Sequence, residues 1–357
     1  MRASGRSPAS TAMTALALAV ASGAALAASC VSGFDSNDQI VSGLRILGAS
    51  AHVDNGDGVD WADADVGDTV TLKVLLANPT AIPSVTVTWL ACVPSLTGAG
   101  IPCTNQGVLR DPVKNLIPLA ADPSSGVLAL GTGETIQYVV PDEVRPLLDQ
   151  VIMRADQNVN SACAIYVEAP LVIVAQGSDG SVFTASKSLR LSPWSRTGPG
   201  ASDAALQYYV RNANPRIAAL AIPNDRTACA GQTLVASCQT DADCGGATCS
   251  PDGWCPPAAF PDGLQTICGQ IPTTDVQTYY QCGLQGPNGT LMEEPRITWY
   301  ETAGLQGSIA SSGPAGSDPD LVSRTFETFS RPAGPFTLYG VVRDGRDGEN
   351  WIEQSFP

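Results

Sequence analysis

Short stretches of the chain alternate hydrophobic and polar residues, and this period of two is typical of half-buried β-strands. Residues 69–76 read Thr-Val-Thr-Leu-Lys-Val-Leu-Leu, and residues 85–90 read Val-Thr-Val-Thr-Trp-Leu. Related patterns predict further strands at Leu44–Ala49, Thr135–Val140, Ala162–Glu168, Leu171–Ala175 and Ser181–Leu191. The Gly-Ser-Asp-Gly segment at residues 177–180 predicts a hairpin turn between the last two.

A second set of strand patterns follows a stretch rich in Ser, Pro and Gly at residues 192–200, which predicts a linker. Its predicted strands are Arg216–Ile222, Val276–Gly283, Arg296–Glu301, Arg324–Ser330, Phe336–Asp344 and Asn350–Ser355. We therefore expect an all-β chain with two Ig-like β-sandwich domains, a first block at 43–192 and a second block at 212–357, joined by a linker at 193–211. One short helix is expected at Asp142–Arg154, with Pro146 limiting its length.

Each block carries a tryptophan in one of its predicted strands, Trp89 in the first and Trp299 in the second. Both blocks also have an early strand and a closing hairpin, which indicates a weak internal repeat. A tryptophan in a central strand usually fills the space between two sheets. The alternative, an exposed platform on which a sugar stacks, fits less well because each tryptophan belongs to an alternating apolar pattern.

The second block is interrupted by a cysteine-rich insert at residues 229–268. Its central part has the pattern Cys-x5-Cys-x4-Cys-x5-Cys, formed by Cys238, Cys244, Cys249 and Cys255. A segment this small buries too little surface to fold alone, so we expect disulfides to hold it. Of the three pairings that four cysteines allow, we favour Cys238–Cys249 with Cys244–Cys255. Zinc is the alternative, although it usually needs closer ligand spacing and often a reducing compartment.

The N-terminus has the features of an export signal at residues 1–29. Arg2 and Arg6 precede an uncharged, alanine-rich apolar run from Thr11 to Ala28. Residues 25–27 fit ordinary signal-peptidase cleavage, whereas residues 27–30 resemble a bacterial lipobox in which Cys30 becomes the lipidated first residue, followed by a polar tether to residue 42. The mature protein is expected to have no transmembrane helix, because no later apolar run approaches the required length.

The number of cysteines favours lipidation over plain secretion. The chain has 11 cysteines, and an exported chain generally pairs its thiols. If Cys30 carries lipid, the remaining cysteines can all pair. Besides the two bridges within the insert, we expect Cys92–Cys103, Cys163–Cys282 and Cys229–Cys268.

The charge and the scarcity of histidine exclude several function classes. The net charge is −15, which repels nucleic-acid backbones and argues against nucleic-acid binding. His52 is the only histidine, so it is the single candidate base for a Ser-His-Asp arrangement; we expect it to be a solvated loop residue instead. We predict no catalytic residue. Phosphate-binding and dinucleotide-binding loops are absent from the sequence.

An acidic, glycine-rich loop follows His52 and offers weak candidates for a calcium ligand set: Asp54, Asn55, Asp57 and Asp60. Calcium prefers several carboxylate and carbonyl oxygens on a flexible loop. In the register of an EF-hand loop, however, the first and twelfth positions are Val53 and Ala64, so two main ligands are missing. An acidic solvated turn is the favoured interpretation, and no cofactor is expected.

Several short motifs resemble predicted lipoproteins of myxobacterial type. They are the lipobox-like Cys30, residues 43–49 (Gly-Leu-Arg-Ile-Leu-Gly-Ala), residues 66–72 (Val-Gly-Asp-Thr-Val-Thr-Leu), residues 89–92 (Trp-Leu-Ala-Cys) and residues 341–346 (Val-Val-Arg-Asp-Gly-Arg). The insert resembles short cysteine modules of exported proteins and, faintly, the dickkopf-type cysteine-rich fold. The resemblance implies Ig-like domains and a surface location, with transfer to the outer membrane permitted by Val31. It implies no activity and no functional residues. At the lipobox, Ala27 stands where the family has a larger apolar residue.

These features predict an exported, lipid-anchored envelope protein with a non-catalytic binding or structural role. Its expected partners are the membrane, through the anchor, and a protein or glycan at the cell surface. Loops on a rigid sandwich commonly serve recognition, so the insert and its neighbouring loops are the favoured surface. The alternatives are an envelope hydrolase that uses a carboxylate pair and a calcium-stabilised adhesion module.

Overall fold

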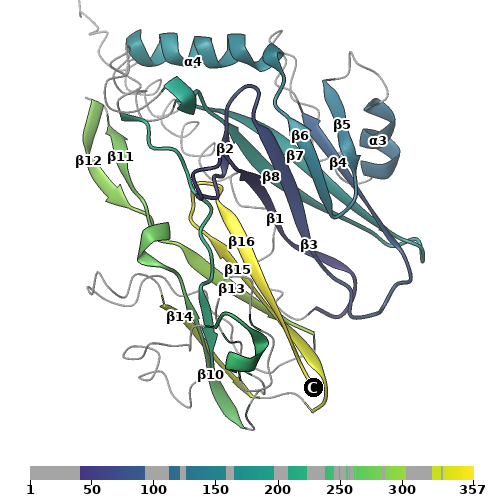
Figure 1. The fold of residues 1–357 in the computed structure, drawn as a ribbon. Coiled ribbons are helices and arrows are strands. Elements are labelled where there is room, and N and C mark those ends of the chain that lie inside the picture. Colours follow the sequence, from purple (N-terminus) through teal and green to yellow (C-terminus); the bar gives the residue numbers. More distant parts are fainter. Residues whose placement is uncertain are drawn as a thin grey trace, which may run out of the picture. The chain divides into compact units, whose positions relative to one another are not determined.

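The computed structural model describes residues 41–92, 112–120, 126–157, 165–196, 208–222, 238–244, 249, 255, 257, 261, 263–283, 286–302, 324–330 and 333–357. Strands dominate these residues, and almost all of the strand pairing is antiparallel (Figure 1). The expected all-β class is therefore confirmed, together with disulfide bonds in the insert. Among the described residues no helix has both the length and the apolar character that crossing a membrane requires.

The first block contributes two sheets. One has the order β1-β3-β6 and is formed by β1 (Arg45–Val53), β3 (Thr69–Ala77) and β6 (Thr135–Val139). The other has the order β2-β8-β7-β4-β5. Its strands are β2 (Asp63–Ala64), β4 (Val85–Cys92), β5 (Val127–Thr132), β7 (Val167–Gly177) and β8 (Val182–Leu191). Only β2 runs parallel to its neighbour, β8.

The second block contributes three sheets among the described residues. β13 (Arg296–Glu301), β15 (Phe336–Arg343) and β16 (Glu349–Phe356) lie side by side in the order β13-β15-β16 (Figure 1). A second sheet has the order β14-β10-β9, with β9 (Ala219–Ala221), β10 (Leu264–Gln270) and β14 (Arg324–Ser330). The third is the two-stranded ribbon of β11 (Thr278–Gly283) and β12 (Gly286–Met292).

Most predicted strands are present, with shifted ends. The strand predicted at Leu171–Ala175 and the last two residues of the one predicted at Ala162–Glu168 belong to a single strand, β7, which forms the expected hairpin with β8; residues 162–164 lie outside the described residues. Pro170 pairs with Ser188 of β8 and lies just beyond the end of the pairing with β4, so on the β4 side it behaves as a residue of an edge strand. The predicted patterns missed β2, β5, β10 and β12, and also α3 (Pro112–Leu119).

The predicted helix at Asp142–Arg154 is present but longer than expected. A 3₁₀ turn, η3 (Asp142–Val144), leads into α4 (Arg145–Gln157). Pro146 was expected to limit the helix, and this expectation is wrong. It lies in the first turn of α4, where its missing N–H has no intrahelical partner to lose. Asp142 makes no N-cap bond; Pro141 occupies the cap position of η3.

Two buried clusters show where the core of the second block lies and how it meets the first. The larger cluster contains Trp299, Ile297, Phe336, Leu338 and Phe356 among others. A second cluster draws on both blocks: Val41, Leu47, Leu75 and Ala77 pack with Tyr300, Tyr339 and Val341. The backbone N–H of Val41 also donates to the carbonyl of Glu301 at 2.9 Å. The first described residues of the chain are thus packed on the strands of the second block.

Candidate functional site

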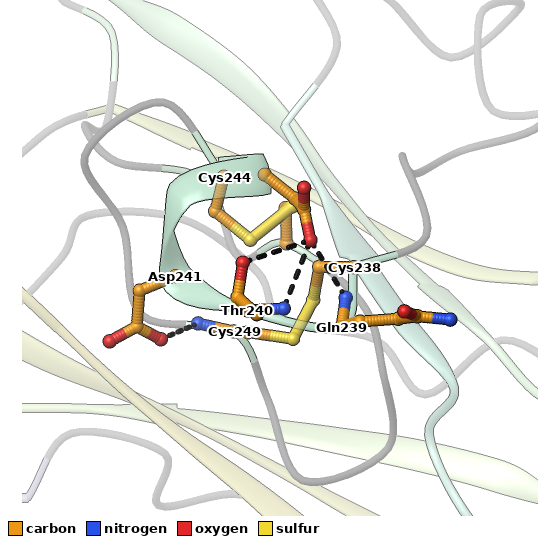
Figure 2. The surroundings of a disulfide bond; sticks show 8 residues. Cys238, Gln239, Thr240, Asp241, Cys244 and Cys249 are labelled. Atoms are coloured by element: carbon orange, nitrogen blue, oxygen red, sulfur yellow. Dashed lines mark hydrogen bonds between the residues drawn. A yellow bond between two sulfur atoms is a disulfide. The ribbon is translucent and has the colours of Figure 1, made fainter.

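The insert is held by two disulfides, Cys238–Cys249 and Cys244–Cys255. These are the two pairings that the sequence analysis favours. Between the first two cysteines lies a 3₁₀ turn, η7 (Asp241–Cys244). Figure 2 shows the Cys238–Cys249 bond with Cys244 beside it. The Sγ atoms of Cys238, Cys244 and Cys249 all lie within 4.8 Å of one another, so the two disulfides are packed together.

Two aspartates tie the backbone of the insert independently of the sulfur bonds. The Asp243 carboxylate accepts from the N–H groups of Gln239 and Thr240, both at 2.9 Å, and from the Thr240 hydroxyl at 3.2 Å. These bonds, the one to Gln239 first, lower the pKa of Asp243. Asp241 Oδ1 accepts from the Cys249 N–H at 2.8 Å (Figure 2). The loop is therefore fixed while residues 239–243 stay exposed to solvent.

For the other predicted disulfides, the structure describes only one cysteine of each pair. Cys92 and Cys268 are both fully buried and disulfide-bonded. Their predicted partners, Cys103 and Cys229, lie outside the described residues, as do Cys163 and Cys30. Cys282 lies in β11. Cys268 lies within β10, so the predicted end of the insert falls inside a paired strand.

The acidic loop after β1 uses its carboxylates to shape its own backbone. Asp54 Oδ1 accepts from the Gly56 N–H at 2.7 Å, and Asp57 Oδ1 accepts from the Val59 N–H at 2.9 Å. Asp57 also accepts from the indole N–H of Trp61 at 3.0 Å. Gly56 and Gly58 adopt positive φ, as such turns require. Among the described residues, the calcium candidates Asp54, Asp57 and Asp60 do not gather as a group of three ligand atoms, and Asn55 is exposed in the same turn.

His52 lies in β1 and is partly buried, so the expected solvated loop histidine is wrong. The alternation of β1 places Ser50 and His52 on one face, and the Ser50 hydroxyl lies 2.6 Å from His52 Nε2. His52 Nδ1 lies 2.6 Å from Asp60 Oδ2, and Asn214 donates to Asp60 Oδ1 at 3.1 Å. The connectivity is that of a catalytic triad, but Ser50 is 0% exposed. In this conformation no substrate reaches its hydroxyl, and the arrangement serves packing.

Trp89 and Trp299 are core residues, as the favoured interpretation predicted. Their exposed fractions are 0% and 1%, which leaves no surface on which a sugar could stack. The Trp89 indole donates to the Gly133 carbonyl at 2.9 Å. Trp299 lies against Gly340, its pairing partner in β15, where a Cβ atom would lie only 2.6 Å from the ring.

The turn between β15 and β16 is the centre of a buried polar network that sequence patterns did not reveal. We call it the hairpin-turn network; its members are Lys187, Arg190, Asn212, Glu293, Asp344, Arg346 and Asp347. Asp344 accepts from the N–H groups of Arg346 at 2.6 Å and Gly348 at 3.0 Å, and from the Asn212 side chain at 2.9 Å. These hydrogen bonds fix the backbone of the turn between β15 and β16. In the sequence, residues 341–346 are recognisable only as a short motif.

Ion pairs extend the network across both blocks. Asp347 pairs with Arg190 of β8 at 3.2 Å, and its carbonyl accepts from Lys187. Arg346 donates to Glu293 at 2.8 Å and to the carbonyl of Val210, and its guanidinium lies 4.8 Å from the centre of the Tyr279 ring. The side chains of Lys187, Arg190 and Glu293 are at most 9% exposed. Buried charges of this kind are stable only when paired, so the turn and β8 depend on each other.

A second part of the buried polar region surrounds Asp63 in β2. The Tyr209 hydroxyl donates to Asp63 Oδ2, which also accepts from the Asn212 N–H at 3.1 Å. Burial raises the pKa of Asp63, and the positive charge of Arg190 opposes that rise. The Asp63 carbonyl accepts from Arg211 at 2.8 Å. Arg211 lies between two indoles, 4.7 Å from the Trp61 ring and 3.8 Å from the Trp194 ring, and burial lowers its pKa to about 10.

Glu293 and Asp344 are neighbouring acids with raised pKa values, so they are the pair to compare with the alternative of a hydrolase that uses two carboxylates. Burial, and then the negative charge of Asp344, raise the pKa of Glu293 to about 7. Burial also raises the pKa of Asp344. Both residues are packed inside the hairpin-turn network, with exposed fractions of 2% and 5%. Their perturbed pKa values therefore arise from a structural network rather than from an open cleft.

Comparison with known proteins assigns no family. No protein-family model matches the chain, and no curated protein does. Among solved structures, the fibronectin(III)-like modules of Clostridium thermocellum CbhA match at a TM-score of 0.20 and 9% identity, over 86% of this chain and 91% of that one. Escherichia coli alpha-2-macroglobulin matches at a TM-score of 0.21 and 8% identity, over 87% of this chain and 16% of that one.

Proposed function

We propose that this protein is an exported, lipid-anchored protein of the cell envelope with a non-catalytic binding or structural role. The observation that supports this is the sulfur chemistry: the insert carries two disulfides, and the buried Cys92 and Cys268 are bonded as well. Disulfides persist in oxidising compartments, which agrees with the export signal at residues 1–29 and with Cys30 as the lipidated residue. The resemblance to myxobacterial lipoproteins with Ig-like domains points the same way.

Within this role, the insert is the recognition surface. Residues 239–243 are exposed, yet the backbone beneath them is fixed by two disulfides and by the bonds to Asp241 and Asp243. A rigid exposed loop loses little conformational entropy on binding, which favours recognition. The partner is a protein or glycan of the cell surface, because the net charge of −15 disfavours polyanions.

Mass spectrometry of the intact native protein tests the export and anchoring. The expected mass is that of a chain beginning at Cys30 with lipid attached and every other cysteine oxidised. Plain secretion would instead give an unlipidated chain that starts before Cys30. A full-length chain that keeps residues 1–29, with free thiols throughout, would contradict the proposal.

Substitution at the exposed turn tests the insert as the binding surface. Ala242→Arg places a charge among the exposed residues of η7 without touching a cysteine. Thr80→Arg is the matched control, because it adds the same charge at an exposed turn between β3 and β4. We expect Ala242→Arg to lower the recovery of crosslinked partners from envelope fractions at least tenfold, and Thr80→Arg to leave it unchanged. Equal recovery with both variants would remove the insert from the binding role.

A further inference from the structure

The four cysteines of the insert are closer in space than their spacing in the sequence suggests. The Sγ atoms of Cys238, Cys244 and Cys249 lie within 4.8 Å of one another, and Cys255 is bonded directly to Cys244. In a tetrahedral zinc site with Zn–S bonds of about 2.3 Å, neighbouring sulfurs are roughly 3.8 Å apart. Once the two disulfides are opened, the sulfurs of each bonded pair have to separate by roughly 1.7 Å to reach that spacing. The Cys244 sulfur already lies close to that spacing from the Cys238 and Cys249 sulfurs. The wide spacing that disfavours zinc in the sequence does not disfavour it in space.

We propose that reduction converts the insert into a Zn²⁺ site whose four ligands are the thiolates of Cys238, Cys244, Cys249 and Cys255. The insert then has two alternative states, one closed by two disulfides and one closed by a metal ion. Zinc binds four thiolates in closed tetrahedral sites and stabilises small domains that cannot fold without it. This inference does not depend on the binding role of the insert.

The hydrogen bonds of the insert keep the cysteines near one another when the disulfides open. Asp243 ties residues 239 and 240 to the end of η7, which closes the loop between Cys238 and Cys244. Asp241 holds the backbone of Cys249 at 2.8 Å. Three of the four ligands thus lie on backbone segments that are joined without sulfur. Zn²⁺ would meet a partly formed site, which lowers the entropic cost of binding.

Among the described cysteines, those of the insert are the most accessible to a reductant. Cys244, Cys249 and Cys255 are partly exposed, whereas Cys92 and Cys268 are fully buried. A phosphine reduces each disulfide to two thiols and is itself oxidised to the phosphine oxide, which takes its oxygen from water. Zn²⁺ then binds as the four thiols release four protons. Residues 238–255 contain Asp241, Asp243 and Asp252 but no Lys, Arg or His, so no cationic side chain of this segment repels Zn²⁺.

Cobalt titration of the full-length protein tests the site. The protein is treated with a phosphine until mass spectrometry after alkylation shows that only the insert cysteines have reacted. Co²⁺ is then added without alkylation, and absorption is recorded before and after Zn²⁺. We expect one Co²⁺ per chain with the intense visible bands of a tetrahedral tetrathiolate site, which Zn²⁺ abolishes. The oxidised protein should show no such bands.

The matched control is the variant Cys238→Ser/Cys244→Ser/Cys249→Ser/Cys255→Ser, reduced in the same way. Far-ultraviolet circular dichroism, which reports the strands outside the insert, checks that it remains folded. Loss of the bands in this folded variant assigns the metal to the insert. The proposal is overturned if reduced wild-type protein gives no tetrathiolate bands, or if the variant gives the same bands, which would place the metal on other thiols.

Discussion

Replacing Trp299 with alanine is expected to lower the free energy of unfolding by about 3–5 kcal/mol. Trp299 is 1% exposed and belongs to the main cluster of the second block, with Ile297, Phe336 and Phe356. The cavity cannot close easily, because the strand backbones around it are fixed by pairing in the β13-β15-β16 sheet. Chemical denaturation of the oxidised protein, followed by circular dichroism, measures the loss. Val182→Ala, at a side chain 41% exposed, should change it by less than about 0.5 kcal/mol.

A second substitution checks that the tryptophan fills its space closely. A Cβ atom on Gly340 would lie 2.6 Å from the Trp299 ring, so Gly340→Ala should cost about 1–3 kcal/mol through overpacking. In the Trp299→Ala background the same change should cost much less, because the ring is gone. If the two losses are simply additive, Gly340 and Trp299 are not in the close contact described.

Arg346→Ala is the second large effect, with an expected loss of about 3–5 kcal/mol. The change removes the partner of the buried Glu293, a donor to the Val210 carbonyl, and the guanidinium over Tyr279. The matched control is Arg296→Ala. Arg296 and its partner Glu294 are 58% and 63% exposed and 4.0 Å apart, so this loss should stay within about 0.5 kcal/mol. Similar losses for the two variants would mean that the hairpin-turn network contributes no more than a surface pair.

The pH dependence gives this prediction a specific sign. Burial raises the pKa of Glu293 from 4.5 to about 7, so between these values the folded protein keeps a proton that the unfolded chain has released. The contribution of Glu293 to stability is therefore present at low pH and is lost as the pH rises through about 7. Without Arg346, the ionised form of Glu293 loses its cationic partner and is destabilised further in the folded protein. The loss from Arg346→Ala should thus be smaller near about pH 5 than near about pH 8. The opposite trend would contradict the assigned cause.

The strands could be predicted well where one face is buried and the other exposed. β3 follows the period of two over most of its length, and the first halves of β4 and β13 do so as well, because adjacent side chains there have opposite environments. β15 is buried along almost its whole length and is recognised as a continuous apolar run instead. β5 and β10 have no clear alternation: the first four residues of β5, Val127 to Leu130, are all apolar, and Gly269 has no side chain near the end of β10. β1 is buried on both faces almost throughout, so alternation does not mark its end, and a prediction from the pattern stops at Ala49 and leaves His52 outside the strand.

Disulfides in the insert could also be predicted from the sequence, because a segment with so few apolar residues needs covalent bonds to hold it, and four cysteines allow only three pairings. The hairpin-turn network could not be predicted from the sequence. The partners of Arg346 are Glu293, Val210 and Tyr279, each more than fifty residues away along the chain. No local sequence pattern indicates such contacts. The residue types at 344–348 predict a turn, but they do not predict which distant residues pack around it.

By itself, the sequence determined the β class, most of the strands and the presence of a cysteine-rich insert, whose pairing it favoured without fixing it. These depend on interactions between residues close in the chain, or on which residue types water excludes. Only the tertiary structure decided that Ser50, His52 and Asp60 join in a buried chain, that Trp299 rests on Gly340, and that the last hairpin turn is held by β8. Such contacts bring together distant segments, and their energy comes from burial and pairing that exist only once the sheets have assembled.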